Sequence, residues 1–221
     1  MLQSSHSAVR KRNKMIPSDY LEIYIADTTV YENEEMYKHA YEQLPLFRRE
    51  RVDAYKHAAS RCQSVAAFML LMDGLRDLDI NPDWDNIGYQ TGENGKPYFE
   101  SMPEIHFNLS HTDGRAMCVI SSIEVGCDIE NIREGKEKLA SRFFAKEEKE
   151  KVKDALSFTK IWTMKESYIK QIGLGLAKPL NEFDVFTCKP RPQIIYETDS
   201  FAGAICTPIE GLTLEKHIHI S

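Results

Sequence analysis

The stretch IHFNLSHTDGRAMCVISSIEVGCDIE, residues 105–130, decides the fold class. Polar and apolar residues alternate over 105–111, a continuous apolar run follows at 116–121, and residues 124–129 form a third strand-like segment. Alternation with a period of two indicates a strand with one buried face, and a short apolar run indicates a strand buried on both faces. The connections between these segments are short enough for hairpins, so we expect three consecutive antiparallel strands.

Segments with helical spacing lie on both sides of these strands. We expect helices at 34–58, 58–77, 136–156 and 158–172, and further strands at 20–26 and beyond residue 183. In the second helix Val65, Phe68, Met69 and Met72 share one face, and Gly173 is typical of a helix C-cap. Helices and strands that are grouped in this way predict an α+β fold.

The chain divides into three expected parts. Residues 1–18 are polar and basic and are expected to be a disordered tail, with Met15 a candidate natural start. Breaks around Met102-Pro103 place the boundary of an N-terminal half at 19–103, and 104–221 forms the C-terminal half that carries the expected metal site.

Composition excludes several classes of protein. The 221 residues include 28 Lys and Arg against 34 Asp and Glu, a net charge of −6, so we expect no nucleic-acid partner. No apolar run approaches the roughly 18–20 residues of a membrane-spanning helix, so we expect no membrane partner. The five cysteines form no C-x-x-C pair, which excludes a disulfide framework or zinc site and favours a reducing, cytoplasmic compartment.

Two acids in Gly126-Cys127-Asp128-Ile129-Glu130 point to a cation site. Asp128 and Glu130 lie on one face of the expected strand, while Cys127 and Ile129 point to the other. Two carboxylates so close together repel each other unless a cation such as Mg²⁺ lies between them. The alternative is a solvated strand edge with two surface acids.

A second set of charges lies on the helix around Trp162-Thr163-Met164-Lys165-Glu166-Ser167-Tyr168-Ile169-Lys170. Trp162, Glu166 and Lys170 stack on one face, and Lys165 lies between that face and an apolar stripe. One acid and two lysines would supply a metal ligand and two phosphate contacts. The alternative is an exposed ion pair between Glu166 and Lys170.

Phosphate-binding side chains also occur earlier in the chain. Lys96, Ser110 and His111 are all hydrogen-bond donors suited to phosphate oxygens. A nucleophile and base at Ser110 and His111 is disfavoured because neighbouring residues of a strand point to opposite faces. Arg48 and Arg51 belong to the densest basic run outside the tail, for which the alternative is an exposed helix face of mixed charge.

In this order, the segments resemble the 4′-phosphopantetheinyl transferase superfamily in its long, surfactin-type branch. Gly95-Lys96-Pro97 followed by FNLSH at 107–111 is similar to the first family signature, residues 126–130 fit G-x-D-[IV]-E, and residues 162–170 fit W-x-x-K-E-[SA]-x-x-K. The long branch is implied because Asp128 lies past the midpoint. The resemblance implies two similar α/β halves that form a pseudo-dimer within one monomeric chain and bind their ligand between them.

The resemblance also implies an activity. Members of the family transfer the 4′-phosphopantetheine group of coenzyme A to a serine of an acyl, peptidyl or polyketide carrier protein and release adenosine 3′,5′-bisphosphate. It implies that Asp128, Glu130 and Glu166 bind Mg²⁺, or alternatively Mn²⁺. It further implies that Glu166 acts as the catalytic base with Lys165 and Lys170 as catalytic lysines. The residues expected to contact the coenzyme A phosphates are Arg48, Arg51, Lys96, Ser110, His111, Lys165 and Lys170.

A carrier protein would present an acidic helix, so we expect a local basic surface on this acidic chain. Segment 132–144 follows the metal strand and contains Arg133, Lys136, Lys138 and Arg142, which makes it the predicted docking surface. Two alternatives stay open at this point. One is a coenzyme A or carrier-binding module of the same fold without turnover, and the other is an unrelated α+β domain.

Overall fold

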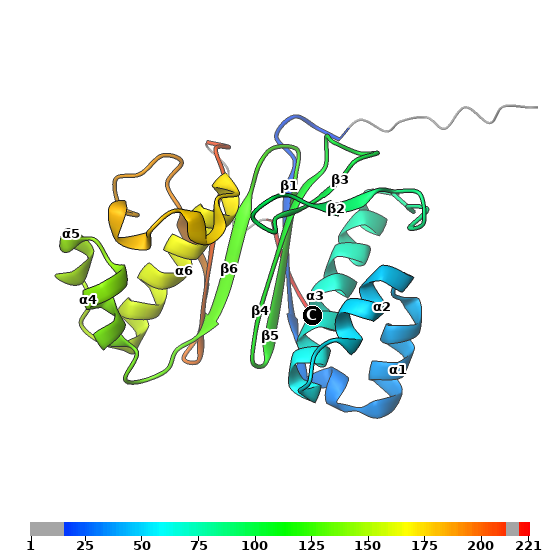
Figure 1. Cartoon of the computed structure of the whole chain (residues 1–221), viewed down its shortest axis with the longest axis horizontal. Coiled ribbons are helices and arrows are strands. Elements are labelled where there is room, and N and C mark those ends of the chain that lie inside the picture. The colour runs from blue at the N-terminus through cyan, green and yellow to red at the C-terminus, as the bar shows by residue number, and fades with distance from the viewer. Residues whose placement is uncertain (1–15, 211–216) are drawn as a thin grey trace, which may run out of the picture.

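The computed structural model describes residues 16–210 and 217–221 (Figure 1). The tail expected at 1–18 therefore lies, up to residue 15, outside the described residues.

Three sheets contain the described strands. The first has the order β4-β5-β1-β9, built from β1 (Leu21–Asp27), β4 (His106–Thr112), β5 (Arg115–Ser121) and β9 (Ile218–Ile220). The second has the order β6-β8-β7, built from β6 (Gly126–Asn131), β7 (Gln193–Glu197) and β8 (Phe201–Cys206). A small hairpin joins β2 (Tyr89–Thr91) to β3 (Pro97–Phe99).

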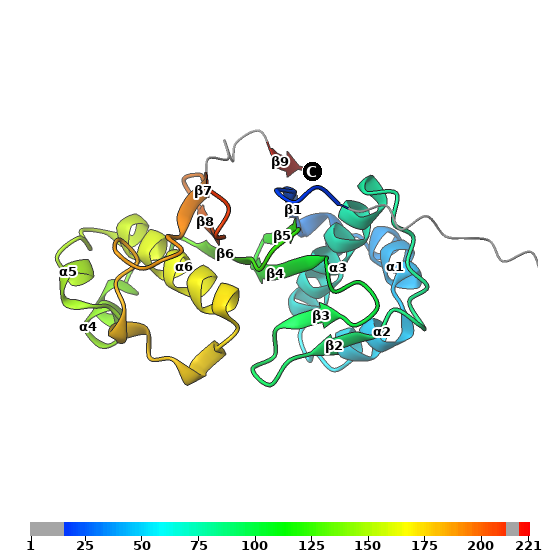
Figure 2. The same cartoon turned by 90° about the horizontal axis from the view of Figure 1, so that it is seen from above.

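The helices lie outside the two larger sheets (Figures 1 and 2). In the first half they are α1 (Glu34–Gln43), α2 (Leu46–Asp53) and α3 (Ala58–Asp77). In the second half they are α4 (Ala140–Phe143), α5 (Lys146–Lys149) and α6 (Ala155–Ile172). Short 3₁₀ turns are η1 (Thr29–Glu32), η2 (Glu137–Leu139), η3 (Gly175–Ala177) and η4 (Leu180–Glu182).

Three apolar clusters hold four layers together. One lies between α3 and the first sheet and includes Phe68 and Ile120, and another lies between the two sheets and includes Ile23 and Ile129. The third lies between α6 and the second sheet. Because β5 is covered on both faces, alternate residues enter different clusters, which explains its continuous apolar run. The α+β class is confirmed, while the likeness of the two halves to each other stays a prediction.

The strand pairing differs from the sequence expectation in one place. The expected hairpin between β4 and β5 is present, with Gly114 at a positive φ of 85°. The prediction of a second hairpin, between β5 and β6, is wrong. After residues 122–124 the chain passes into the second sheet, where β6 pairs with β8 instead of β5. The two sheets therefore divide after Ser121. The boundary between the halves at residue 103 stays a prediction.

The helices agree with the sequence where their end signals are strong. The expected helix at 58–77 is confirmed as α3, and α6 ends at Gly173, which has a φ of 68°. The helix expected at 34–58 breaks at Leu44 and Pro45, because proline cannot continue the first helix but can begin the next. The region expected as one charged helix at 136–156 contains only short pieces before α6.

Within the described ranges, no helix combines the length and the apolar character that a membrane span requires. All five cysteines are free thiols.

Candidate functional site

A cavity of about 330 Å³ lies where the two halves of the molecule meet. One wall comes from α2, the β2–β3 hairpin and β4, and the other comes from α6 and the turns after it. The basic and acidic residues that line it are Arg48, Arg51, Lys96, His111, Glu166, Lys170 and Lys178. Five cationic side chains therefore face a cavity in which Glu166 is the one lining carboxylate among the described residues.

Arg48 holds a buried positive charge at this cavity. Its guanidinium donates through Nη2 to the carbonyl oxygen of Ser64 at 3.0 Å and to Ser64 Oγ at 2.8 Å. It packs over the Phe68 ring at 5.1 Å, and its Nε is buried without a hydrogen-bond partner. Burial lowers the pKa of Arg48, but a guanidinium stays charged at neutral pH. Arg48 has no carboxylate partner among the described residues, so this charge favours an anionic ligand.

His111 lines the same cavity in its neutral form. Burial lowers its pKa to about 4, and the positive charges of Lys170, Arg48 and Arg51 act in the same direction. A neutral imidazole retains one N–H donor and one acceptor nitrogen. The structure thus brings together four of the residues predicted to contact phosphate: Arg48, Arg51, His111 and Lys170.

Lys96 also reaches the cavity, but its ammonium group is already engaged. Its Nζ donates to the Gln171 carbonyl at the end of α6 at 2.9 Å and forms an ion pair with Glu124. Glu124 also contacts His106 Nδ1 at 3.2 Å. The hydrogen bond with His106 and the charge of Lys96 lower the pKa of Glu124 to about 2. Lys96 thereby links the β2–β3 hairpin to α6.

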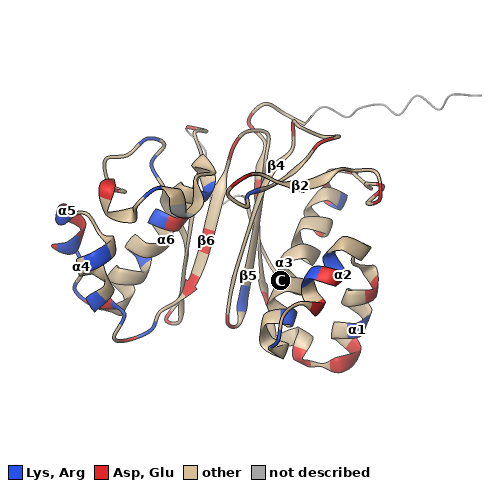
Figure 3. Ribbon diagram, viewed as in Figure 1, with Lys and Arg blue, Asp and Glu red and all other residues tan. Residues whose placement is uncertain are grey.

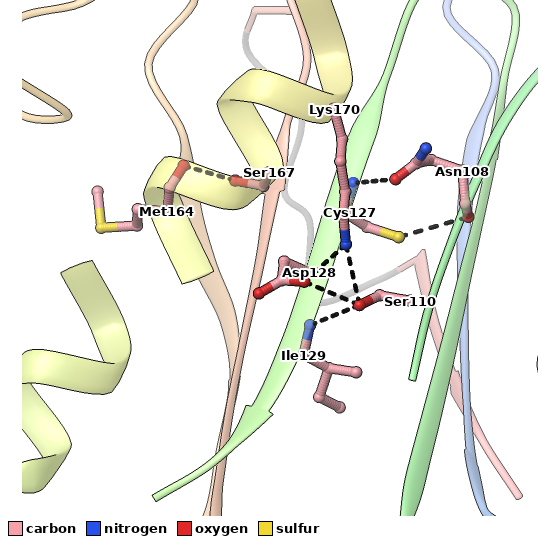
Figure 4. Close-up of polar contacts among 8 residues, drawn as sticks. All are labelled: Asn108, Ser110, Cys127, Asp128, Ile129, Met164, Ser167 and Lys170. Atoms are coloured by element: carbon pink, nitrogen blue, oxygen red, sulfur yellow. Dashed lines mark hydrogen bonds and ion pairs between the residues drawn. The ribbon is translucent and has the colours of Figure 1, made fainter. Parts of the chain in front are cut away.

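Asp128 lies at the centre of a polar cluster between β4, β6 and α6 (Figure 4). Its Oδ1 accepts from Lys170 Nζ at 2.7 Å and from Ser110 Oγ at 2.8 Å. Lys170 Nζ also donates to Ser110 Oγ at 3.1 Å. The second carboxylate oxygen, Oδ2, is buried without a hydrogen-bond partner. Ser110 therefore contacts Asp128 and Lys170 and does not line the cavity.

Glu130 and Glu166 share the surroundings of Asp128. Burial raises the pKa of each glutamate, and the Asp128 carboxylate raises both further. The alternation predicted for β6 is confirmed, because Cys127 and Ile129 enter the apolar cluster between the sheets. However, the described residues contain no group of three or more acidic, His or Cys side chains arranged to hold a metal ion. The three predicted ligands are neighbours, but they do not form a preassembled site.

Lys165 is not brought to the cavity. Its side chain is fully buried and its Nζ pairs with the equally buried Glu148 at 2.7 Å. The same Nζ donates to the carbonyl oxygens of Leu180 and Phe183, both at 2.7 Å. Burial lowers the pKa of Lys165, while Glu148 opposes that shift. The predicted contact of Lys165 with phosphate is therefore absent from this arrangement, because the three donors of its ammonium are all used.

Comparison with known proteins gives an independent view of this region. Residues 124–214, which include β6 and α6, match the family model of the 4′-phosphopantetheinyl transferase superfamily. This part of the chain belongs to that superfamily. The chain is 38% identical over 144 residues to the 4′-phosphopantetheinyl transferase gsp of Aneurinibacillus migulanus, covering 58% of this chain and 60% of that protein. It is 39% identical over 109 residues to the 4′-phosphopantetheinyl transferase Sfp of Bacillus subtilis strain 168, covering 47% and 49%.

The chain thus spans about half to two thirds of the length of the curated phosphopantetheinyl transferases that it matches. The surfactin-type branch that the sequence predicts is confirmed by these relatives.

A divalent cation fits the donor chemistry of these three carboxylates. Asp128, Glu130 and Glu166 offer the hard oxygen ligands that Mg²⁺ and Mn²⁺ prefer. The unpartnered Oδ2 of Asp128 is a buried lone-pair donor, which is costly to leave without a positive partner. The ammonium of Lys170 already neutralises the other oxygen of Asp128.

Asn108 and Lys178 are among the cavity-lining side chains that the sequence analysis missed. Asn108 lines the cavity two residues before Ser110, so the period of the strand would have placed it on the same face. Lys178 lines the cavity beyond the end of α6, in a segment whose sequence carries no signal for that position.

Proposed function

We propose that this protein transfers the 4′-phosphopantetheine group of coenzyme A to a serine of an acyl, peptidyl or polyketide carrier protein. The observation that carries the proposal is the cavity between the halves. A basic wall from α2, β3 and β4 faces α6, which carries Glu166 and Lys170 beside Asp128. The family model of the 4′-phosphopantetheinyl transferase superfamily matches residues 124–214, which include α6.

The basic wall suits the phosphates of coenzyme A. The buried charge of Arg48 and the nearby Arg51 would bind an anionic group, and His111 would donate its one N–H. Lys170 lies on the opposite wall and would contact the pyrophosphate. Lys96 would hold the hairpin against α6 while it faces the same ligand. This division assigns phosphate binding to residues that the structure places at the cavity.

The transfer is a displacement at phosphorus. The serine oxygen of the carrier forms a bond to the pantetheine-linked phosphorus as the bridging P–O bond breaks, and adenosine 3′,5′-bisphosphate leaves. The serine proton needs an acceptor, and Glu166 is the carboxylate that lines the cavity. We therefore assign Glu166 as the base. Lys170 would stabilise negative charge that develops on the pyrophosphate oxygens.

We propose that Asp128, Glu130 and Glu166 hold Mg²⁺, for which Mn²⁺ is a substitute. When bound, such an ion supplies Lewis-acid stabilisation of the pyrophosphate charge. The support is the set of three carboxylates and the buried free oxygen of Asp128. Lys165 contributes differently, because its buried pair with Glu148 fixes α6 against the turn at 180–183.

Segment 132–144 remains our proposed docking surface for the carrier. It follows β6 directly and contains η2 and α4, where Leu139 is exposed and Arg142 packs over Phe143 at 5.1 Å. Figure 3 shows basic residues on α4 and α5 on the outer side of this half. Charge reversal in Lys138→Glu together with Arg142→Glu should raise KM for the carrier and leave KM for coenzyme A unchanged. A parallel rise in both constants would contradict this docking surface.

The setting of the reaction is also part of the proposal. Five free thiols suit a reducing compartment, so we propose that the protein acts in the cytoplasm. Both walls of the cavity come from one chain, so we propose that a monomer is active.

Intact-mass spectrometry tests the transfer directly. Apo carrier protein mixed with the enzyme, coenzyme A and Mg²⁺ should gain the mass of one phosphopantetheine group. The gain should be lost with EDTA and in Glu166→Gln, whereas Glu42→Gln, an exposed substitution on α1, should behave as wild type. Binding of coenzyme A without a mass gain on acyl and peptidyl carriers would favour a binding module that lacks turnover.

A further inference from the structure

The two larger sheets meet where β4 runs beside β6, and the contact is made by side chains. Within the described residues, β4 pairs with β5 and β6 pairs with β8, and no backbone hydrogen bond joins β4 to β6. Asn108, Ser110 and Thr112 follow one another at alternate positions of β4 and reach across to β6. We call these three side chains the seam.

Each member of the seam contacts a defined group on β6 (Figure 4 shows the first two). Asn108 Oδ1 accepts from the backbone N–H of Cys127 at 2.9 Å, and Ser110 Oγ accepts from the N–H of Ile129 at 3.3 Å. Thr112 Oγ1 hydrogen-bonds Asn131 Oδ1. Asn108 is 4% exposed and Cys127 is fully buried, so the first of these bonds is shielded from water.

The seam replaces a backbone ladder along one edge of β6. In an antiparallel pair, alternate residues direct their backbone groups away from the partner strand. On β6, the N–H groups of Cys127 and Ile129 therefore face β4 while the strand pairs with β8. Buried N–H groups need acceptors, and the side chains of Asn108 and Ser110 supply them. The bonds lie on either side of Asp128.

We propose that Asn108 is a positioning residue that fixes Asp128 for cation binding, an inference that rests on the proposed function. Asn108 holds the backbone immediately before Asp128, and Ser110 holds the backbone immediately after it. Ser110 additionally holds Oδ1 of Asp128, which leaves Oδ2 as the free oxygen. Loss of the Asn108 acceptor would free the Cys127 N–H and let the peptide before Asp128 rotate. The carboxylate would then lose its fixed direction.

The test compares two isosteric substitutions in the same seam. Asn108→Leu removes the acceptor for Cys127 N–H, and Thr112→Val removes the bond to Asn131, which lies beyond both acids of β6. The probe is Mn²⁺ alone, with free Mn²⁺ followed by electron paramagnetic resonance. Partners of a metal ligand typically change metal affinity by about 10–100-fold when they are removed. We expect Asn108→Leu to weaken Mn²⁺ binding at least about tenfold, and Thr112→Val to stay within about twofold.

Amide hydrogen exchange gives a readout that does not depend on the metal. In metal-free protein, the Cys127 amide, which loses its acceptor, should exchange faster in Asn108→Leu, while it should be unchanged in Thr112→Val. If Asn108→Leu fails to fold, Asn108→Ser provides the same comparison, since its hydroxyl lies nearer its own backbone than Asn108 Oδ1 and falls short of Cys127 N–H.

The outcomes separate this inference from the proposed function. Wild-type Mn²⁺ binding with an unchanged affinity in the folded Asn108 variant would overturn the positioning role alone. A wild-type protein that binds no Mn²⁺ would overturn the proposed cation site and this inference with it. A rise in KM for Mg²⁺ at constant KM for coenzyme A, seen in Asn108→Leu and not in Thr112→Val, would support both.

Discussion

Lys165 and Lys170 lie five positions apart on α6, and each pairs with a carboxylate at 2.7 Å, yet their surroundings differ. Lys165 and Glu148 are fully buried, and every donor of the Lys165 ammonium has an oxygen partner. The Lys170 side chain is 29% exposed, lines the cavity, and leaves one oxygen of its partner Asp128 free. A closed pair of this kind maintains structure, whereas an open pair can exchange its partner for a ligand.

Removing the Lys165 charge from the buried Lys165–Glu148 pair should have the largest effect on stability. Lys165→Met leaves Glu148 buried without its counter-ion, which typically costs about 3–5 kcal/mol in the free energy of unfolding. Urea denaturation followed by circular dichroism measures this loss. The double variant Lys165→Met with Glu148→Leu should recover part of it, because neither charge then remains buried. A single variant as stable as wild type would remove the distinction between the two lysines.

Gly126 lies where β6 packs against α6, the helix that carries both Lys165 and Lys170. A Cβ at this position would lie 2.1 Å from the Ser167 carbonyl oxygen and 2.3 Å from the Gln171 nitrogen, both backbone atoms of α6. Gly126→Ala should therefore displace α6 from β6 and destabilise the protein by about 1–3 kcal/mol, as overpacking generally does. Transfer activity should fall as well, since Glu166 and Lys170 move with the helix. Gly92→Ala is the steric control, because its Cβ would meet only the Lys96 carbonyl oxygen at 3.7 Å, an ordinary van der Waals contact.

Lys170→Met tests the open pair. Asp128 would keep its bond from Ser110, and its carboxylate lies beside the cavity, so we expect a smaller loss of stability than in Lys165→Met. Affinity for adenosine 3′,5′-bisphosphate should fall about tenfold, the usual scale for one lost bond to a charged group. Isothermal titration calorimetry measures it. An unchanged affinity would show that Lys170 pairs with Asp128 and does not contact the ligand.

The pH dependence of stability should reflect His111, which lines the cavity. Because the pKa of His111 falls from 6.5 to about 4 on folding, the unfolded chain binds more protons between these values. Stability should therefore decrease as the pH falls from about 6.5 towards 4. His111→Asn should flatten this part of the profile, which thermal unfolding across that pH range would follow. An equally steep decrease in the variant would assign the pH dependence to other groups.

Local signals in the sequence predict where helices and strands lie better than they predict which strands pair with each other. Alternation placed β4 and the two faces of β6 correctly, the continuous apolar run placed β5, and Gly173 marked the end of α6. The partner of β6 was predicted wrongly, because a short connection allows a hairpin but cannot exclude a crossover to another sheet. The alternation of residues along a strand shows which face is buried, but it does not show which strand pairs with its edge.

The candidate site shows the same limit. Helical periodicity put Lys165 between the charged and apolar faces of α6, which did not decide whether it reaches the cavity. Its partner Glu148 lies in a segment rich in charges, whose sequence is typical of an exposed helix. The Glu148 side chain is nevertheless buried, and its carboxylate accepts from the distant backbone N–H of Val185 as well as from the nearby N–H of Ala145. Arg48 and His111 could be predicted as site residues because their side chains are typical anion-binding groups. Asn108 could not, because its partner is the backbone N–H of Cys127, and a sequence does not show which backbone groups need a partner.

β9 has a consequence for how the chain can be divided. It follows the second sheet in sequence but pairs in parallel with β1, and His217 and His219 both contact the Glu22 carboxylate. Proteolytic cleavage in the 122–125 connection would therefore not release two independent lobes. A fragment ending there would expose the bare edge of β1, which is a template for intermolecular pairing. The two fragments should instead remain associated after nicking and co-elute in native chromatography, as interlocked pieces of one folding unit.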